Sequence, residues 1–200
     1  MWKLKGSSAA VEGYALDEGS AVIADIAAAS GRDILDLAAA PGGKTLIMRA
    51  RGASVVSNDV SIARLRRLHG KIVVSDGRHP PFRRKFQTVL LDAPCSATGT
   101  IRKNPELKWR LQESDLESFA ALQRELLASA LALAEESVIY STCSVEPEEN
   151  DQVVASTGAA LVRPPVNDDV AMWLDRDVLR LTPESGADGF TCHVLRLDVP

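Results

Sequence analysis

The sequence predicts an α/β fold in which a mainly parallel sheet is covered by helices on both faces. Short apolar segments with β-branched residues alternate with segments whose apolar residues recur at helical spacing. Strands joined by helices pair in parallel, and the helices then cover both faces of the sheet. Two last strand-like segments flank a Pro-Glu-Ser-Gly turn, which predicts a closing hairpin and one antiparallel strand.

The expected elements follow one another at regular intervals. An alanine-rich helix over 21–29 ends at Gly31. The expected strands cover 34–37, 54–58, 72–75, 88–91, 137–142, 178–181 and 190–197. Further helices are expected over 44–50, 62–68, 115–134 and 147–155, the last with Glu146, Glu148 and Glu149 near its positive end. This seven-stranded outline resembles the class I, Rossmann-like fold of S-adenosylmethionine-dependent methyltransferases.

Length and composition place the chain among ordinary soluble proteins. Its 200 residues suffice for one domain with a sizeable core, and 46% of them are hydrophobic and 25% charged. No apolar run approaches the roughly 18 residues that span a membrane, and no signal-peptide core follows the first residues. We therefore expect a single cytoplasmic domain over 1–200, with 1–30 as a lead-in and first helix.

Four expected strands are followed closely by an aspartate: Asp36, Asp59, Asp76 and Asp92. Aspartate also begins turns. Four acids along one sheet edge nevertheless indicate a ligand, because ligands bind beyond the carboxyl ends of parallel strands. An acid at the end of the second strand commonly accepts hydrogen bonds from ribose hydroxyls, and one at the third could hold an adenine.

A loop of small residues, 38–43, leads from the first strand to Lys44 and Thr45. Its Gly-Gly-Lys-Thr ending looks like a phosphate loop, but that pattern requires a glycine at the position of Ala38, and Pro41 lies within it. Small residues instead let the backbone approach a ligand closely, and Lys44 could meet a carboxylate. S-adenosylmethionine offers a carboxylate, a ribose and an adenine.

Two cysteines stand where strands give way to loops. Cys95 lies three residues after Asp92, and Cys143 follows the strand over 137–142. With Cys192 the count is three, and no spacing is typical of a metal site, so we expect free thiols and no metal. Free cysteines are often simply buried, as expected for Cys192, whereas a thiol pair beside an acid suggests covalent chemistry.

Several motifs together resemble the Sun (Fmu, or Nop/Sun) family of RNA cytosine-C5 methyltransferases, over about residues 14–197. They read DLAAAPGGKT, SDGR, LLDAPCSATGTIRKNPELKW, YSTCSVEPEEN and a late DGF. Within the family, the likeness is greatest to bacterial enzymes of small-subunit (16S) ribosomal RNA. The resemblance implies that an S-adenosylmethionine-binding loop is formed by Ala38, Ala39, Ala40, Pro41, Gly42, Gly43 and Lys44.

The resemblance also implies roles for acids and thiols. Asp59 would hold the ribose, Asp76 the adenine side, and Asp92 would lie near the methyl donor and the target base. Cys143 would be the nucleophile, and Cys95 would help to release the product. The chemistry agrees, because carbon 5 of cytosine becomes nucleophilic once a thiolate adds to carbon 6. An acid such as Asp92 would assist by protonating N3, but no histidine in the motif can deprotonate Cys143.

The net charge is −4, so the chain as a whole is not a basic nucleic-acid binder. Basic residues nevertheless cluster within 64–71, 78–85 and 102–110, which fits phosphate contacts or a merely solvated surface. Trp109 would either stack on a base or cap the core. We expect the rim of the active-site opening to carry Arg78, Arg83, Arg84, Lys103 and Lys108.

The chain departs from the family pattern in three places. Ala38 replaces a usual cysteine, and the short span from Asp59 to Asp76 predicts a curtailed helix. We also expect no RNA-binding domain before the catalytic one, so that RNA is selected by a minimal enzyme or by a separate partner. The expected product is 5-methylcytosine in 16S ribosomal RNA. The alternatives are a tRNA cytosine-C5 methyltransferase, a non-catalytic RNA-binding or assembly module, and a small-molecule or protein methyltransferase; the oligomeric state is open.

Overall fold

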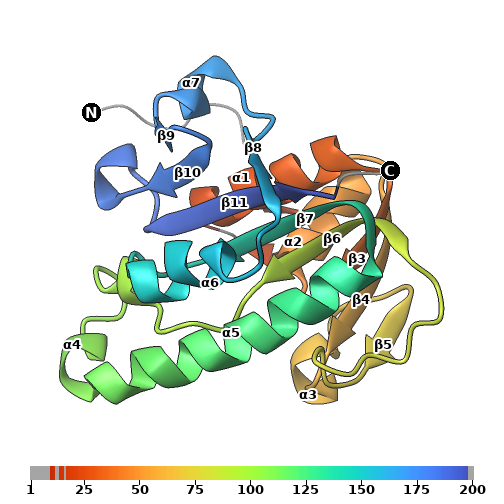
Figure 1. Cartoon of the computed structure of the whole chain (residues 1–200), viewed down its shortest axis with the longest axis horizontal. Coiled ribbons are helices and arrows are strands. Elements are labelled where there is room, and N and C mark those ends of the chain that lie inside the picture. Colours follow the sequence, from red (N-terminus) through yellow and green to blue (C-terminus); the bar gives the residue numbers. More distant parts are fainter. Residues whose placement is uncertain (1–9, 12–13, 16, 198–200) are drawn as a thin grey trace.

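A computed structural model describes residues 10–11, 14–15 and 17–197. Its centre is a sheet in which five strands are parallel, in the order β5-β4-β3-β6-β7 (Figure 1). These strands are β3 (Asp33–Asp36), β4 (Ser54–Asp59), β5 (Ile72–Val74), β6 (Phe86–Asp92) and β7 (Ala134–Thr142). The alternation of strand and helix along the chain therefore produces the parallel sheet that the sequence predicts.

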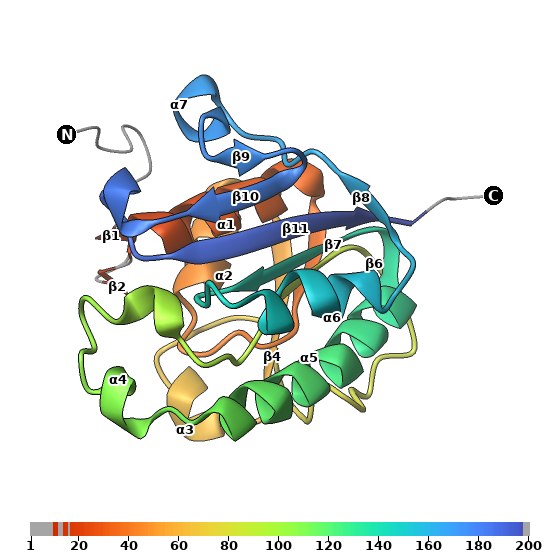
Figure 2. The same cartoon turned by 60° about the vertical axis from the view of Figure 1, so that its left-hand side comes forward.

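The sheet continues beyond β7 with antiparallel strands. β11 (Phe190–Arg196) pairs with β7, and β10 (Val178–Leu181) pairs with the first half of β11. Two short strands complete the sheet (Figure 2): β8 (Ala160–Val162) pairs with the second half of β11, and β9 (Leu174–Asp175) pairs with β10. The expected fold class is confirmed, but this sheet has nine strands rather than seven, because segments of two or three residues carry no periodic pattern.

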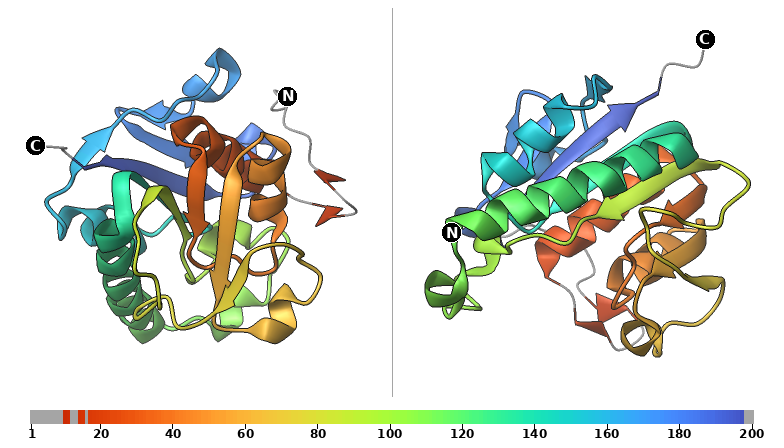
Figure 3. Two further views of the ribbon diagram at one scale, coloured as in Figure 1. Left: turned by 90° about the vertical axis from the view of Figure 1, so that its right-hand side faces the viewer. Right: turned by 60° about the horizontal axis from the view of Figure 1, so that its bottom comes forward.

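Helices cover both faces of the sheet (Figure 3). One face packs against α1 (Glu18–Ser30) and α2 (Gly43–Ala50), and the other against α5 (Glu113–Leu133) and α6 (Asp151–Ala155). Along β6, Leu90 belongs to the first core layer, whereas Val89 and Leu91 belong to the second. Because both faces are buried, the middle of each central strand is apolar.

The long helices begin at side-chain caps. Asp17 accepts a hydrogen bond from the Gly19 N–H at the start of α1, and Gln112 and Asp115 form a capping box at the start of α5. The remaining elements are short: β1 (Ala10–Val11), β2 (Tyr14–Ala15), α3 (Ile62–Leu65), α4 (Leu107–Arg110), α7 (Asp168–Ala171), η1 (Thr98–Thr100), η2 (Pro147–Glu149) and η3 (Pro183–Ser185). Among the described residues, no helix is long and apolar enough to cross a membrane.

Two expected helices are shorter in the structure. The curtailed helix between Asp59 and Asp76 is α3, which has only four residues. The single helix expected over 147–155 is wrong, because Asn150, with φ −120° and ψ −92°, separates η2 from α6. Glu149 and Asn150 are fully buried, so their polar side chains are directed into the protein, and the chain leaves helical geometry to place them there.

Candidate active site

The acids that follow the parallel strands gather at one edge of the sheet. Asp36, Asp59 and Asp92 are the last residues of β3, β4 and β6, and Asp76 lies two residues beyond β5. Two cavities open at this edge, with volumes of about 390 Å³ and 230 Å³. Both are lined by Ala38, Ala40 and Asp92, so they adjoin each other. The larger one has the size of a small-molecule site.

Most of the residues singled out in the sequence line these two cavities. The smaller cavity is lined by Ala38, Ala39, Ala40, Pro41, Gly43 and Lys44, together with Asp36 and Asp92. The larger cavity is lined by Asp59, Asp76, Asp92, Cys95 and Cys143. Gly42 lines neither cavity; it has a φ of 111° at the start of α2, and a Cβ atom there would lie 3.0 Å from Leu68. Gly42 therefore allows the backbone of the loop to turn into α2 with a positive φ, close to Leu68.

Asp59 fixes the loop that separates the two cavities. One carboxylate oxygen accepts from the Ala40 N–H at 3.0 Å, and the other accepts from the Ser61 N–H at 2.9 Å. The backbone N–H of Ala39 donates to Asn58 at 2.8 Å. Asp76 is held differently, because Arg78 donates to both its oxygens and keeps the pKa of this carboxyl at about 2.

Asp36 forms part of the wall of the smaller cavity, and the sequence did not assign it a role. Its side chain is buried and accepts a 2.6 Å hydrogen bond from the Thr45 hydroxyl. Burial raises the pKa of Asp36 to about 7, although the Thr45 hydrogen bond acts in the opposite direction. A positive group entering this cavity would favour the ionised form. The sequence signal for its place in the cavity wall is its position at the end of a strand, two residues before the small-residue loop.

Lys44 connects the loop to the end of β6. Its ammonium donates to Asp92 at 2.6 Å and to Ser20 at 3.2 Å, and Ser141 donates to the other oxygen of Asp92 at 2.8 Å. Burial alone would lower the pKa of Lys44, but the adjacent Asp92 more than offsets this and the pKa is raised. Lys44 is therefore a cation paired with Asp92, whereas the sequence suggested a ligand carboxylate as its partner.

The two thiols meet beside this ion pair. The Sγ atoms of Cys95 and Cys143 are 3.3 Å apart, although the residues are 48 positions apart in sequence. The hydrogen bond from Cys95 lowers the pKa of Cys143, and the charge of Lys44 acts in the same direction against burial and Asp92. The same hydrogen bond and burial raise the pKa of Cys95. Of the two thiols, Cys143 is therefore the one that ionises more readily, and Cys95 is the one that holds its proton more tightly.

A close backbone contact holds the thiol loops against the late Asp-Gly-Phe motif. The Gly99 N–H donates to Cys143 at 3.0 Å, and the Gly189 N–H donates to Gly99 at 2.8 Å. A Cβ atom on Gly99 would lie 2.3 Å from the Gly189 oxygen, so a side chain at Gly99 would separate these segments. Phe190, the last residue of the motif, places its ring 5.5 Å from the Lys44 ammonium.

Comparison with known proteins identifies the family. The family model described as 16S rRNA methyltransferase RsmB/F matches residues 24–195. The chain belongs to this RsmB/F family. It is 37% identical over 183 residues to ribosomal RNA small subunit methyltransferase B of Photorhabdus laumondii, covering 80% of this chain and 41% of the relative. It is 41% identical over 139 residues to the same-named protein of Sodalis glossinidius, covering 62% of this chain and 32% of that relative.

Solved structures agree with the family and with the expected Sun-family resemblance. PH0851 has a TM-score of 0.83 at 32% identity, over 96% of this chain and 49% of that protein. NSun6 from Pyrococcus horikoshii, solved with SFG, has a TM-score of 0.78 at 25% identity, over 96% of this chain and 56% of NSun6. This RsmB/F-family chain therefore spans about half of these structures, and less of the curated relatives.

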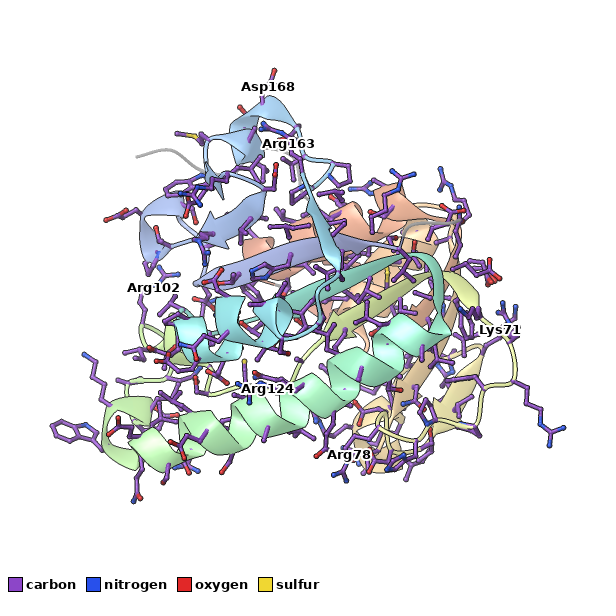
Figure 4. All side chains as sticks on the ribbon, viewed as in Figure 1. Lys71, Arg78, Arg102, Arg124, Arg163 and Asp168 are labelled. Atoms are coloured by element: carbon purple, nitrogen blue, oxygen red, sulfur yellow. The ribbon has the colours of Figure 1, made fainter. Side chains whose placement is uncertain are left out.

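The basic residues of this RsmB/F-family chain divide between two edges of the sheet. Arg78 lines the larger cavity, together with Arg64 of α3. The expectation that Arg84 rims the same opening is wrong, because Arg84 pairs with Asp33 at the amino end of β3. Its neighbour Arg83 lines neither cavity. Figure 4 shows two basic residues from different clusters, Lys71 and Arg102, on opposite sides of the molecule. The clusters in the sequence are therefore not one surface.

The segment after the first thiol carries basic residues in two different environments. Lys103 forms ion pairs with Asp17 at 2.5 Å and with Asp188 at 2.8 Å, and Asp17 lines the smaller cavity. Lys108 and Arg110 of α4 form no ion pair within the described part of the chain. Between them, Trp109 is 88% exposed, so it does not cap the core. Cys192 is fully buried in β11, as expected.

Proposed function

We propose that this chain is the catalytic domain of an S-adenosylmethionine-dependent enzyme that forms 5-methylcytosine in small-subunit ribosomal RNA. The observation that carries the proposal is the contact of 3.3 Å between the Cys95 and Cys143 sulfurs. Family membership supports the RNA substrate, and the thiol pair supports a covalent route at cytosine. The proposed setting is the cytoplasm, and regions or partners outside this chain would select the RNA.

The two cavities fit the parts of S-adenosylmethionine. The smaller cavity offers Asp36 to the ammonium and the backbone of the loop, 38–43, to the carboxylate. The larger cavity offers Asp59 to the ribose hydroxyls and Asp76 with its neighbours to the adenine side. Bound there, the cofactor supplies an electrophilic methyl group next to Asp92. The same larger cavity reaches the thiols, so cofactor and cytosine would meet at the boundary between the two cavities.

The thiols have different tasks in the proposed reaction. Cys143, already favoured as the thiolate, forms a bond to carbon 6 of cytosine. Asp92 receives a proton from Lys44 and donates it to N3 of cytosine. The electron pair of the carbon 5–carbon 6 double bond then becomes available at carbon 5, which accepts the methyl group. Once Cys143 is bonded to carbon, its charge no longer raises the pKa of Cys95. Cys95 can then release its proton to solvent and remove the carbon-5 proton, as the bond from carbon 6 to Cys143 breaks and Cys143 leaves as the thiolate. N3 returns its proton to the Asp92–Lys44 pair.

Separate removal of each thiol tests this assignment. Cys143→Ala should abolish methyl transfer and form no covalent complex, because no group attacks carbon 6. Cys95→Ala should still allow attack and methyl transfer, but the product should stay attached to Cys143. A denaturant-resistant protein–RNA complex should therefore accumulate with Cys95→Ala and be absent from the double variant. A complex with Cys143→Ala instead would reverse the roles, and unchanged turnover in both variants would refute thiol catalysis.

The identity of the RNA is tested in cells. Bisulfite sequencing of RNA from cells with and without the gene should show one cytosine in 16S ribosomal RNA that loses its methyl group. Loss of methylation in tRNA would contradict the proposed substrate but leave the chemistry intact. Absence of any difference, together with a purified chain that binds RNA without methylating it, would favour a non-catalytic RNA-binding module.

The exposed end of α4 supports contact with RNA near the site. Trp109 offers a ring on which a base can stack, and Lys108 and Arg110 offer charges to phosphates. The segment carrying them follows η1, whose Gly99 contacts the Cys143 loop. An unpaired base held there would lie on the chain segment that leads from the first thiol.

A further inference from the structure

Beneath the two thiol loops lies a buried carboxylate that the proposed reaction does not use. Glu149 is the last residue of η2 and is fully buried. One oxygen accepts from the Ser96 N–H at 2.9 Å and from Gln123 at 3.0 Å. The other accepts from the Ser144 hydroxyl at 2.6 Å and from the Ser96 hydroxyl. Both oxygens of this carboxylate therefore accept, from four donors in all.

The donors come from the residues that directly follow the two thiols. Ser96 follows Cys95, and Ser144 follows Cys143, so one carboxylate is bonded to both loops. These loops leave different strands, β6 and β7. They are also joined by the Gly99 contact, by Thr98, whose hydroxyl lies 3.1 Å from the Ser144 hydroxyl and accepts from the Val145 N–H, and by the Ser96 and Ser144 hydroxyls, which lie 3.2 Å apart. Glu149 therefore couples the positions of the two loops, because its carboxylate is hydrogen-bonded to both of them.

The two serine hydroxyls next to the thiols both donate to Glu149. The Ser96 and Ser144 hydroxyls each donate their single proton to Glu149. The Ser144 oxygen is then left to accept, and it lies 3.1 Å from the Thr98 hydroxyl and 3.1 Å from the Glu146 N–H. The Ser96 and Ser144 oxygens also lie 3.2 Å apart, and this contact holds no proton when both hydroxyls donate to Glu149. Removing the carboxylate would leave both buried hydroxyls without their present acceptor.

No cation balances the charge of Glu149. Within the described chain, its carboxylate forms no ion pair, and its partners are the neutral donors above. The nearby Cys95 responds to this charge: its pKa is raised chiefly by the hydrogen bond with Cys143 and by burial, with Glu149 acting in the same direction. The charge therefore lies on the side of Cys95, whereas the cation Lys44 lies on the side of Cys143.

We propose that Glu149 is a positioning residue that holds the Cys95 and Cys143 loops in register through Ser96 and Ser144, so that the two sulfurs stay in contact at 3.3 Å. This inference rests on the proposed function, because it assumes that unequal thiols are needed for methyl transfer. Glu149 acts through Ser96 and Ser144 and lines neither cavity. The reaction would therefore depend on a carboxylate that does not contact the substrate.

The test measures the thiols without RNA or cofactor. Iodoacetamide alkylates thiolates, and mass spectrometry can follow Cys95 and Cys143 separately, with the fully buried Cys192 as an unreactive reference. In the unaltered chain, Cys143 should react first, with a pH midpoint below the roughly 8.5 of an ordinary thiol. The other titratable groups around the pair are Lys44, Asp92, Tyr140 and Arg124, and all stay unchanged in the variants.

Glu149→Gln keeps the length of the side chain and removes its charge. The ratio of Cys143 to Cys95 alkylation at neutral pH should fall about tenfold, the factor expected for lost hydrogen bonds to a charged group. Glu149→Ala also separates the loops, and the pH midpoint of Cys143 should rise by about one unit as the bond from Cys95 is lost. Glu148→Gln, in the same turn but without a side-chain hydrogen bond in the described structure, should behave as the unaltered chain.

An unchanged ratio and midpoint in a folded Glu149→Gln variant would overturn the inference. If Glu149→Ala does not fold, Ser144→Ala tests the connection instead, because it removes one donor and leaves the carboxylate; unchanged thiol selectivity there would also count against it. Failure of the proposed function is distinguishable, because the alkylation pattern requires no RNA. A chain with unequal thiols that depend on Glu149, but with no methyl transfer, would keep this inference and refute the proposed reaction.

Discussion

The two ends of β3 carry the same residue type in opposite situations. Asp33 begins the strand, is partly exposed, and pairs with Arg84 at the protein surface. Asp36 ends the strand, is buried, and accepts a hydrogen bond from the neutral Thr45 hydroxyl; burial raises its pKa to about 7. A step of three positions along one strand leads from an ordinary surface ion pair to a carboxyl in the candidate site.

The difference reflects the two edges of a parallel sheet. At the carboxyl edge, the loops after β3, β4 and β6 enclose cavities, and charges there are removed from water. At the amino edge, ion pairs such as Arg84 with Asp33 face solvent and contribute little to stability. The same residue types therefore have functional consequences at one edge and few at the other. The variants at Lys44, Asp59 and Lys108 are each paired below with a control at the amino edge.

The largest effect is expected at Lys44. Lys44→Met removes the cation beside Cys143 and leaves Asp92 without its 2.6 Å partner, so single-turnover methyl transfer should fall at least about a hundredfold. The alkylation midpoint of Cys143 should also rise, because Lys44 helps to lower its pKa. Arg84→Met, at the other edge, should leave the methylation rate unchanged. Equal losses from both variants would contradict the assignment of function to one edge.

A smaller effect is expected at Asp59. Asp59→Ala removes the acceptor proposed for the ribose and releases the Ala40 N–H, so the Kd for S-adenosylmethionine should rise about tenfold or more. Calorimetry without RNA measures it directly. Asp33→Ala serves as the control, and it should bind the cofactor as the unaltered chain does. Unchanged affinity in Asp59→Ala would remove this residue from the site.

The pH dependence of cofactor binding tests Asp36. Its pKa of about 7 means that it is largely protonated below neutral pH without ligand, and a cofactor ammonium favours the ionised form. Affinity should therefore rise up to about tenfold from pH 6 to pH 8, and Asp36→Asn should lose this dependence. A dependence that persists in the variant would assign it to another group.

The same pKa predicts that the stability of the fold without ligand falls as pH rises, whereas the affinity for the cofactor rises. A carboxyl whose pKa is raised on folding binds its proton more tightly in the folded state, so its contribution declines as pH rises from about 4 to 7. Asp36→Asn should therefore be more stable than the unaltered chain above neutral pH, as measured by chemical denaturation. Greater stability only in acid would contradict the burial of Asp36.

The smallest effect is expected for single surface charges. Lys108→Glu should reduce the slope of log affinity against log salt for a single-stranded RNA by about one unit, because one phosphate contact is lost. Lys71→Glu, at the amino edge next to Ser54, should leave that slope unchanged. Equal slopes for both variants and the unaltered chain would mean that α4 does not contact RNA.

Much of this molecule follows from local patterns in the chain. Alternating apolar segments locate β3, β4 and β6, because burial on both faces requires an apolar strand. The acid at each strand exit then falls at one edge, because the parallel connection leaves no other arrangement. The small-residue loop and the two cysteine motifs place the cavities and thiols in the correct loops for the same reason. The family resemblance added roles that periodicity does not contain.

The tertiary structure decided what depends on register between distant segments. Asp92 pairs with Ser141 across β6 and β7, and this alignment brings Cys95 and Cys143 into contact; a one-residue shift would separate them. The buried position of Glu149, the break at Asn150 and the position of Arg84 at the far edge likewise depend on packing across the sheet. The sequence by itself determined which groups are present and which strand ends carry them. Only the folded chain determined which thiol keeps the proton, because proton affinity depends on charges and burial contributed by residues that are remote in sequence.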